Sequence, residues 1–282
     1  MRFAAVVPIW GEYADPRVIR DLAVATEESG WDGLFVADQI VFNNTTKPAV
    51  GDATVSLAAA ATVTKSITLG TWVTAIPRHR PSRLAREFAA LDVLSGGRMV
   101  LGAGLGGPAD DEFATFGEDP SFKVRAEKTD EALDLIARLW SGETVDHVGK
   151  HYVARDVRFT PTPIQAPRVP VWVAVRWPNE AKEPFRRAAR WDGMMPVRFG
   201  PEWQRPFTPD EIAALLGRVL AHRHASTPFE VAFSGRSEGP QDNELSPRYE
   251  AAGVTCWLET FHEWRGPMSE TLERIKLGPP RR

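Results

Sequence analysis

The fold is decided by one stretch of the chain, which reads ITLGTWV at 67–73, PSRLAREFAALDVL at 81–94 and MVLGA at 99–103. The two outer segments are short apolar runs, as expected of buried strands. The middle segment repeats its apolar residues at the spacing of an amphipathic helix and begins with proline, which suits a first helical turn. A strand, a helix and a second strand in this order predict a β-α-β unit with parallel strands.

The same alternation continues along the rest of the chain. Strands are predicted at 3–10, 33–37, 67–73, 99–103, 169–175, 193–195, 229–233 and 254–258, and helices at 16–29, 50–64, 81–94, 122–140, 180–190, 209–222, 244–252 and 267–277. About eight such units favour one (β/α)8 TIM barrel over 1–282, with a doubly wound open sheet as the alternative. Residues 143–167 break the rhythm and are interpreted as an excursion over one barrel edge, and 278–282 as a mobile tail.

Composition narrows the class of protein. Hydrophobic residues make up 43% and charged residues 25% of the chain, which is typical of a globular enzyme. A net charge of -3 argues against a nucleic-acid or anionic-membrane surface, so the expected partner is a small organic molecule. The single cysteine, Cys256, cannot form an internal disulfide, and no histidines have ligand spacing, so no metal site is expected. No signal peptide or membrane span is recognised, and a cytoplasmic location is expected.

In a TIM barrel the active site is built by the loops that leave the carboxyl ends of the strands. Asp38 and Gln39 follow the second predicted strand. Asp38 is interpreted as a hydrogen-bonding or proton-transfer group, or else as a loop brace. His79 follows the third strand within the basic triplet 78–80, whose cations would meet a phosphate or anionic substrate. The alternative for this triplet is a solvated surface.

Two further loops offer groups to a ligand. The glycine-rich loop at 102–107 (GAGLGG) allows close approach of a planar ring, or is only a tight turn. Its similarity to a dinucleotide-binding fingerprint is weak, because no strong helix follows it directly. The loop at 174–179 is expected to run straight into a helix, so its N–H groups and Arg176 are interpreted as a phosphate site. Arg176 would otherwise form a surface ion pair.

Taken in order, these segments resemble the bacterial luciferase-like flavin-dependent oxidoreductases. The most specific part is 66–106, and 28–35, 188–193 and 252–259 support it. The resemblance implies an eight-stranded barrel that binds FMN, or in one branch the deazaflavin coenzyme F420, at the carboxyl ends of its strands.

The resemblance also implies a set of site residues. Those expected at the cofactor are Trp10, Trp72, Val73, Thr74, Gly104, Leu105, Gly106, Ala174, Val175, Arg176 and Trp177, and Asp38 and Gln39 would be hydrogen-bonding groups close to its ring. Together with His79, which is a candidate from its place in the third loop, Asp38 and Gln39 form the expected catalytic set. The third-strand bulge would back the isoalloxazine ring, and the glycine-rich loop would line its other side. The two tryptophans 10 and 72 would serve as apolar walls, and the loop at 174–177 would approach the ribityl phosphate.

Two departures from the family pattern bear on the cofactor. Gln39 stands where many deazaflavin-dependent members have histidine, which favours FMN over F420. Val175 and Arg176 stand where many members have two glycines, so they either crowd the cofactor or compensate by charge.

Three functions follow from the resemblance. The first is a monooxygenase that receives reduced FMN from a flavin reductase and reacts it with dioxygen and an organic substrate. The second is F420-dependent hydride transfer, in which Arg78, Arg80 and Arg198 would meet the acidic tail of the coenzyme. The third is a barrel without turnover that acts as a binding or dimer-partner protein. A homodimer is expected from the family alone.

Overall fold

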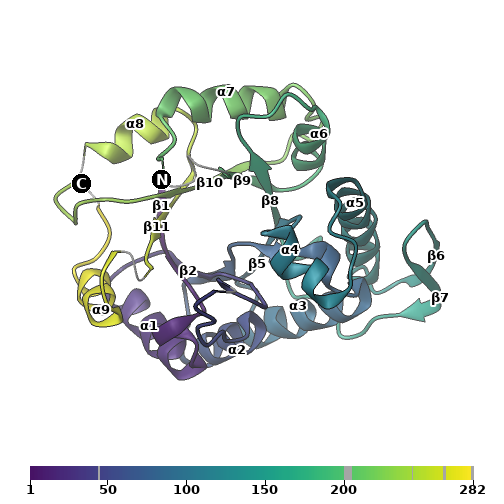
Figure 1. Ribbon diagram of the computed structural model, residues 1–282, viewed down its shortest axis with the longest axis horizontal. Coiled ribbons are helices and arrows are strands. Elements are labelled where there is room, and N and C mark those ends of the chain that lie inside the picture. Colours follow the sequence, from purple (N-terminus) through teal and green to yellow (C-terminus); the bar gives the residue numbers. More distant parts are fainter. Residues whose placement is uncertain (44, 200–204, 243, 263–264, 281–282) are drawn as a thin grey trace.

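The computed structural model describes residues 1–43, 45–199, 205–242, 244–262 and 265–280, and its centre is a ring of parallel strands surrounded by helices (Figure 1). The strands of the ring are β1 (Arg2–Val7), β2 (Gly33–Val36), β3 (Thr68–Thr71), β4 (Thr74–Ala75), β5 (Met99–Gly104), β8 (Val171–Arg176), β9 (Gly193–Val197), β10 (Glu230–Gly235) and β11 (Cys256–Thr260). They follow the order β3-β2-β1-β11-β10-β9-β8-β5-β4, and a pairing of β3 with β5 closes the ring.

Strand segments β3 and β4 together occupy a single position in the ring. Both pair with β5: Leu69 and Gly70 lie beside Met99 and Val100, and Thr74 lies beside Ala103. The nine segments therefore fill eight positions. The predicted (β/α)8 barrel is confirmed, and the open-sheet alternative is wrong because the sheet has no free edge.

The helices cover the outside of the ring. They are α1 (Pro16–Glu28), α2 (Ala53–Val63), α3 (Pro81–Ser95), α4 (Ala109–Glu112), α5 (Phe122–Leu139), α6 (Glu183–Ala189), α7 (Pro209–Leu220), α8 (Leu245–Ala251) and α9 (Met268–Lys276). Short 3-10 turns lie at η1 (Gly11–Tyr13), η2 (Ile76–Arg78) and η3 (Ala114–Phe116). Local chemistry sets several ends: the Asp52 carboxylate accepts the Val55 N–H at 2.8 Å to cap α2, and Gly96 ends α3 with φ of 71°.

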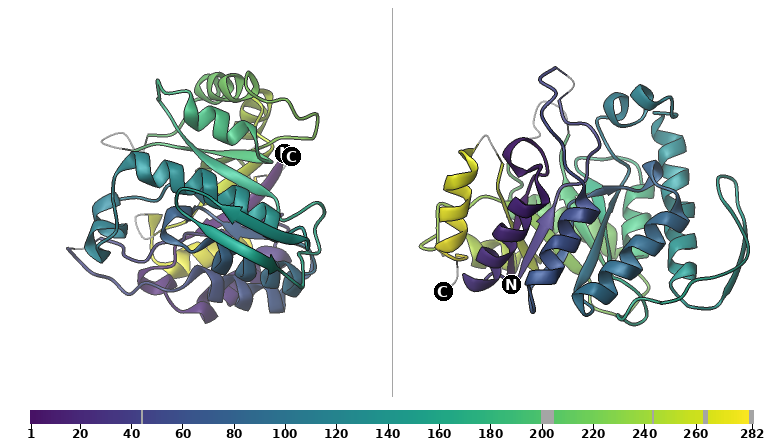
Figure 2. Two further views of the ribbon diagram at one scale, coloured as in Figure 1. Left: turned by 90° about the vertical axis from the view of Figure 1, so that its right-hand side faces the viewer. Right: turned by 90° about the horizontal axis from the view of Figure 1, so that it is seen from below.

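The excursion predicted at 143–167 contains an antiparallel hairpin of β6 (Thr144–Val148) and β7 (Val153–Arg158). The hairpin projects from the side of the barrel (Figure 2) and its tip is fixed to α5 by Glu131, which accepts the N–H groups of His151 and Tyr152. At the other end of the chain, the carbonyl of Gly278 accepts a hydrogen bond from Arg274 at 2.7 Å. Residues 281–282 of the predicted tail lie outside the described residues.

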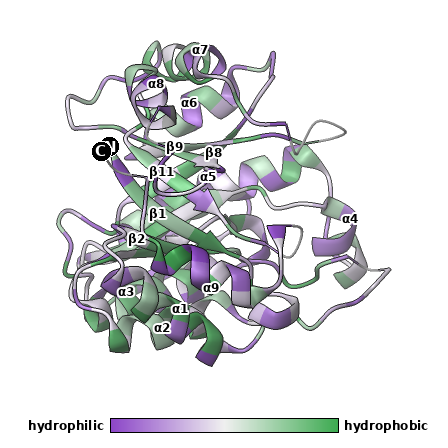
Figure 3. Cartoon of the chain, turned by 90° about the vertical axis from the view of Figure 1, so that its left-hand side faces the viewer, coloured by the Kyte–Doolittle hydropathy of each residue, from purple (hydrophilic) through white to green (hydrophobic). Residues whose placement is uncertain are grey.

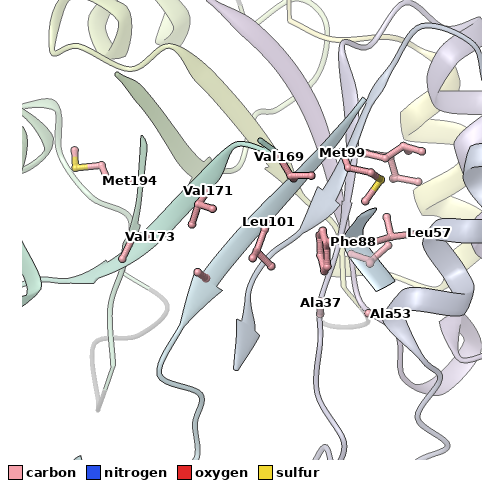
Figure 4. Packing of buried hydrophobic residues seen from close by; sticks show 14 of the residues in the cluster. Ala37, Ala53, Leu57, Phe88, Met99, Leu101, Val169, Val171, Val173 and Met194 are labelled. Carbon is pink, nitrogen blue, oxygen red and sulfur yellow. The ribbon is translucent and has the colours of Figure 1, made fainter. Parts of the chain in front are cut away.

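Two hydrophobic clusters form the core. The larger lies between the strands and the surrounding helices and includes Leu101, Val171 and Phe88 (Figure 4). The smaller fills the inside of the ring with residues such as Phe35 and Trp172, whose rings stack with centroids 5.4 Å apart. The strands are accordingly mostly hydrophobic, whereas the outer helices carry both hydrophilic and hydrophobic residues (Figure 3). Within the described residues, no helix is both long and apolar enough to cross a bilayer.

Closure of the ring requires a residue without a side chain at position 102. We expect Gly102→Ala to lower the free energy of unfolding by at least about 2 kcal/mol, because overpacking a core strains its backbone. The added methyl would lie 2.0 Å from the carbonyl oxygen of Thr71. Gly217→Ala in α7 is the matched control, since its methyl would lie more than 4 Å from every atom outside the neighbouring backbone of its own helix, and alanine favours a helix by about 0.5–1 kcal/mol. Urea unfolding of both variants measures the difference, and equal stabilities would contradict the close β3–β5 contact.

Candidate active site

The carboxyl ends of the parallel strands meet at one end of the barrel, which we call the mouth. Four polar side chains come together there from three separate segments. Asp38 follows β2, Arg78 and His79 lie in and directly after η2, and Glu112 is the last residue of α4. Of these, Asp38 and His79 were predicted as site residues from the sequence, and Glu112 was not.

Arg78 is the centre of this group. Its guanidinium donates through Nη2 to Oδ1 of Asp38 and through Nη1 to Oε2 of Glu112. The Arg78 side chain is 4% exposed and that of Glu112 only 1%, so the ion pair between them is shielded from water. Glu112 also accepts the backbone N–H of Ile40 at 3.0 Å and thereby fixes the loop after Asp38. Arg78 is therefore committed to internal carboxylates, and the expectation that it meets an external phosphate or acidic tail is wrong.

Asp38 is held as a carboxylate by its neighbours. Burial by itself would raise the pKa of Asp38, but the polar side chains of His79 and Thr74 and the charge of Arg78 together lower the pKa below its ordinary value. Nε2 of His79 lies 3.7 Å from Oδ2 of Asp38. The mouth therefore contains an ionised carboxylate beside a histidine that is 24% exposed.

The contact between β3 and β5 lies at the bottom of the mouth, which we call its floor. The Trp72–Val73 peptide is cis, and it interrupts the strand between β3 and β4. The hydroxyl of Thr71 bridges the gap, since it donates to the Gly102 carbonyl and accepts the Gly102 N–H, both at 3.1 Å. Trp72 packs against the cluster inside the ring and so forms the floor rather than a side wall. Its Nε1 is buried without an acceptor among the described residues, a deficit that water or a ligand commonly fills.

Small residues on three adjacent strand ends form a shelf above this floor. A Cβ atom at Gly104 would lie 2.9 Å from Cγ2 of Val73 and 3.5 Å from Cβ of Ala174. Val73, Gly104 and Ala174 therefore lie close together at the ends of β4, β5 and β8. Because all three residues are small and apolar, they leave an apolar surface with little bulk, which suits contact with a planar heteroaromatic ring.

The end of β8 differs from the predicted phosphate site. Val175 is fully buried in the cluster outside the ring, so its side chain does not crowd the mouth. Arg176 is exposed, with its guanidinium carbon 5.9 Å from the ring centre of Phe199. The chain does not run straight into a helix, because a cis peptide precedes Pro178 and α6 begins only at Glu183. A phosphate site at this loop would therefore depend on Arg176 and not on a helix amino terminus.

The other predicted residues line the rim. Trp10 stacks on Phe42 with ring centroids 4.0 Å apart. Gln39 is half-buried next to Asp38, and its side chain forms no hydrogen bond within the described chain. Trp177 is partly buried against the outer cluster, and its N–H donates to the carbonyl of Val197 at 3.0 Å.

The glycine-rich loop is held by a residue that sequence reasoning missed. Arg125 of α5 donates to the carbonyls of Leu105 at 3.0 Å and Gly106 at 2.7 Å. Gly106 has φ of 76°, and a Cβ there would lie 2.7 Å from Cβ of Ala75. The loop is thus a tight, braced turn beside the shelf. No local sequence pattern links Arg125 to this loop, because Arg125 lies 20 residues after Leu105 and 19 after Gly106.

Besides Arg78, the sequence suggested Arg198 and Arg80 as cations that would meet the acidic tail of F420. Arg198 is buried, pairs with Glu211 at 3.1 Å and lies over the ring of Phe207, so it is unsuited to that role. Arg80 is exposed directly before α3. Arg80 and Arg176 are therefore the two predicted cations that remain exposed.

A cavity of about 330 Å³ lies at the opposite, amino-terminal end of the strands. Four of its charged lining residues form ion pairs, Arg2 with Glu230 and Arg168 with Asp192, and the fifth, Arg98, donates to the backbone carbonyls of Ile67 and Thr64. In the described part of the chain, no group of three or more histidine, cysteine or acidic residues is arranged to hold a metal. The mouth therefore remains the best candidate for the active site.

Comparison with known proteins relates this geometry to a family. The model of the luciferase-like monooxygenases matches residues 2–226. Over 176 residues the chain is 35% identical to the F420-dependent glucose-6-phosphate dehydrogenase of Gordonia bronchialis, a match that covers 61% of this chain and 51% of that protein. The aligned region thus represents about half of that relative's length.

Two solved structures share the fold. An F420-dependent secondary alcohol dehydrogenase, solved with an F420-acetone adduct, has a TM-score of 0.79 at 18% identity and covers 99% of this chain and 98% of its own. The monooxygenase RslO1 from Streptomyces bottropensis has a TM-score of 0.77 at 20% identity and covers 98% and 97%. Because both identities are low, these likenesses establish the barrel but not the reaction.

The buried ion pair generates a stability prediction. We expect Glu112→Gln to lower the free energy of unfolding by about 3 kcal/mol, since removing one partner leaves the buried charge of Arg78 less compensated. Glutamine keeps an oxygen for the Ile40 N–H, so the variant isolates the charge. Glu87→Gln is the control, because its partner Arg83 is 74% exposed and such pairs contribute below about 0.5 kcal/mol. Chemical denaturation measures both, and a small effect of Glu112→Gln would contradict the assigned pair.

The lowered pKa of Asp38 predicts how its contribution depends on pH. A carboxyl group with a lowered pKa in the folded state stabilises the protein above its unfolded pKa of about 4 and loses that contribution as the pH falls. We therefore expect wild type to exceed Asp38→Asn in stability at pH 7, and the difference to shrink as the pH falls below about 4. Denaturation across pH 3–7 measures it, and a pH-independent difference would show that Asp38 is not held ionised by its neighbours.

Proposed function

The chain belongs to the luciferase-like monooxygenase family, and we propose from this membership that it is an F420-dependent oxidoreductase acting between an alcohol and a carbonyl compound. The observation that carries the proposal is the 35% identity to an F420-dependent dehydrogenase. The FMN-dependent monooxygenase predicted from the sequence is the second candidate, and the shared fold of RslO1 is compatible with it. Gln39 favoured FMN in the sequence analysis, but we give more weight to the 35% identity with an F420-dependent dehydrogenase.

The mouth offers groups suited to such a coenzyme. The tricyclic ring would lie across the shelf of Val73, Gly104 and Ala174, above the indole of Trp72. Exposed Arg176 and Arg80 would meet its phosphate and acidic tail. A bound deazaflavin accepts or returns a hydride, while the protein supplies orientation and electrostatics.

The residues of the chain have distinct tasks in this reaction. The Arg125 brace would hold the carbonyls of Leu105 and Gly106 in place beside the coenzyme. The buried pair of Arg78 and Glu112 would fix Asp38 at the edge of the shelf. Because these groups are already ordered, little of the binding free energy would be lost in arranging them.

Direct titration distinguishes the two cofactors. We expect the purified protein to bind F420 at least about tenfold more tightly than reduced FMN, a difference of about 1.4 kcal/mol, when coenzyme fluorescence is followed under anaerobic conditions. Arg176→Ala should weaken F420 binding about threefold or more, because it removes a cation at the mouth. Arg155→Ala, in the exposed hairpin strand β7, removes the same charge elsewhere and should leave binding unchanged. Tight binding of reduced FMN without binding of F420 would favour the monooxygenase instead.

A further inference from the structure

His79 is placed to transfer a proton at the mouth. It follows η2, directly after Arg78, and its imidazole lies beside Asp38, which follows β2. Nε2 is the nitrogen turned toward Asp38, at 3.7 Å from Oδ2. Among the described residues, the other ring nitrogen, Nδ1, has no hydrogen-bond partner, and the side chain is 24% exposed. One nitrogen is thus engaged by the protein, and the other is left for a ligand.

The charges of the cluster determine which nitrogen carries the proton. Nη2 of Arg78 also lies 3.4 Å from Nε2 of His79, and a bond from this donor would require Nε2 to be an acceptor. However, the guanidinium already donates to Asp38 and Glu112, and these three groups sum to one negative charge. A negative surrounding favours a donor at Nε2, directed at Asp38. With Nε2 protonated, Nδ1 of a neutral imidazole is an acceptor.

We infer that His79 is the proton-transfer residue of the proposed reaction, that Asp38 orients it, and that Arg78 with Glu112 positions Asp38. This inference rests on the proposed function. In alcohol oxidation, Nδ1 takes the hydroxyl proton of the substrate. The carbinol C–H bond breaks, its hydride passes to the bound deazaflavin, and the O–H bonding pair becomes the second bond of the carbonyl group. In the reverse direction the imidazolium returns its proton to the carbonyl oxygen.

Two other histidines also contact carboxylates, but they lie away from the mouth. His147 contacts Glu131 and His151 contacts Glu127 of α5, at the hairpin outside the barrel. A carboxylate that orients an imidazole is a recurring device for proton transfer, and the pair of Asp38 and His79 has this arrangement at the mouth. His151 with Glu127, at 3.2 Å, therefore provides a matched pair of the same chemistry away from the site.

The first experiment tests the orientation of His79 without any coenzyme. Nitrogen-15 NMR of the purified protein at neutral pH reports which imidazole nitrogen carries hydrogen. We expect the Nε2–H form for His79 in wild type and a weaker bias toward it in Asp38→Asn. Observation of the Nδ1–H form in wild type, or no response to Asp38→Asn, would overturn the inference.

The second experiment tests proton transfer. We expect His79→Ala to bind F420 with wild-type affinity, to lose at least about 100-fold in kcat, the range typical of a general base, and to regain activity when imidazole is added. His151→Gln should retain wild-type kcat. Wild-type kcat in His79→Ala would overturn the role of His79 and leave the proposed function intact. If His79→Ala binds F420 poorly, His79→Asn is measured in its place, and lack of rescue of His79→Ala by imidazole would count against the inference.

An incorrect proposed function would be recognised from a different measurement, the binding of F420 to the wild type. If wild type binds no F420, the alcohol and carbonyl chemistry is excluded whatever His79 does. The NMR measurement still decides whether Asp38 orients His79, because it needs no coenzyme. The two results therefore separate an incorrect cofactor from an incorrect proton-transfer residue.

Discussion

The contact between Thr71 and Gly102 is the constraint on which the site depends. Ring closure brings the carbonyl of Thr71 so close to Gly102 that a methyl group there would lie 2.0 Å from it. At this point the regular ladder stops at the Trp72–Val73 peptide, and the Thr71 hydroxyl satisfies both polar groups of the Gly102 backbone. A buried backbone group left without a partner is costly, so the hydroxyl is what allows the strand to bulge here. The bulge places Trp72 on the floor and delivers η2 to the mouth.

A buried cluster of charged side chains fixes the polar groups of the candidate active site. Two carboxylates, Asp38 and Glu112, share the guanidinium of Arg78 in surroundings that are nearly closed to water. Removing ions from water is unfavourable, and the arrangement is stable because both carboxylates contact the Arg78 guanidinium. Two carboxylates and one guanidinium leave one net negative charge, and His79 lies beside it. The Arg78 guanidinium is therefore unavailable to an external ligand, which leaves binding of an anionic coenzyme to the exposed arginines Arg80 and Arg176.

The order of strands and helices could be predicted from the sequence to within a few residues, since apolar periodicity and caps such as Asp52 act locally. The hairpin at 144–158 could not, because its strands are largely exposed and lack clear alternation. Glu112 was missed for a related reason. It ends the acidic run 110–112, which is indistinguishable from a solvated surface until the loop folds against Arg78. Its partner Arg78 lies 34 positions earlier in the chain, beyond the reach of any local pattern.

By itself the sequence determined that the chain forms a barrel and that Asp38, His79 and the glycine-rich loop lie at one end of it. Those properties follow from local periodicity and from the rule that parallel strands end on the same side. Tertiary structure alone decided which side chains meet there. It turned Val175 outward into the core, committed Arg78 to two carboxylates and joined Val73 to Gly104 in a shelf. These outcomes depend on the register of the strands around the closed ring. That register is set by contacts between residues that lie far apart in the chain.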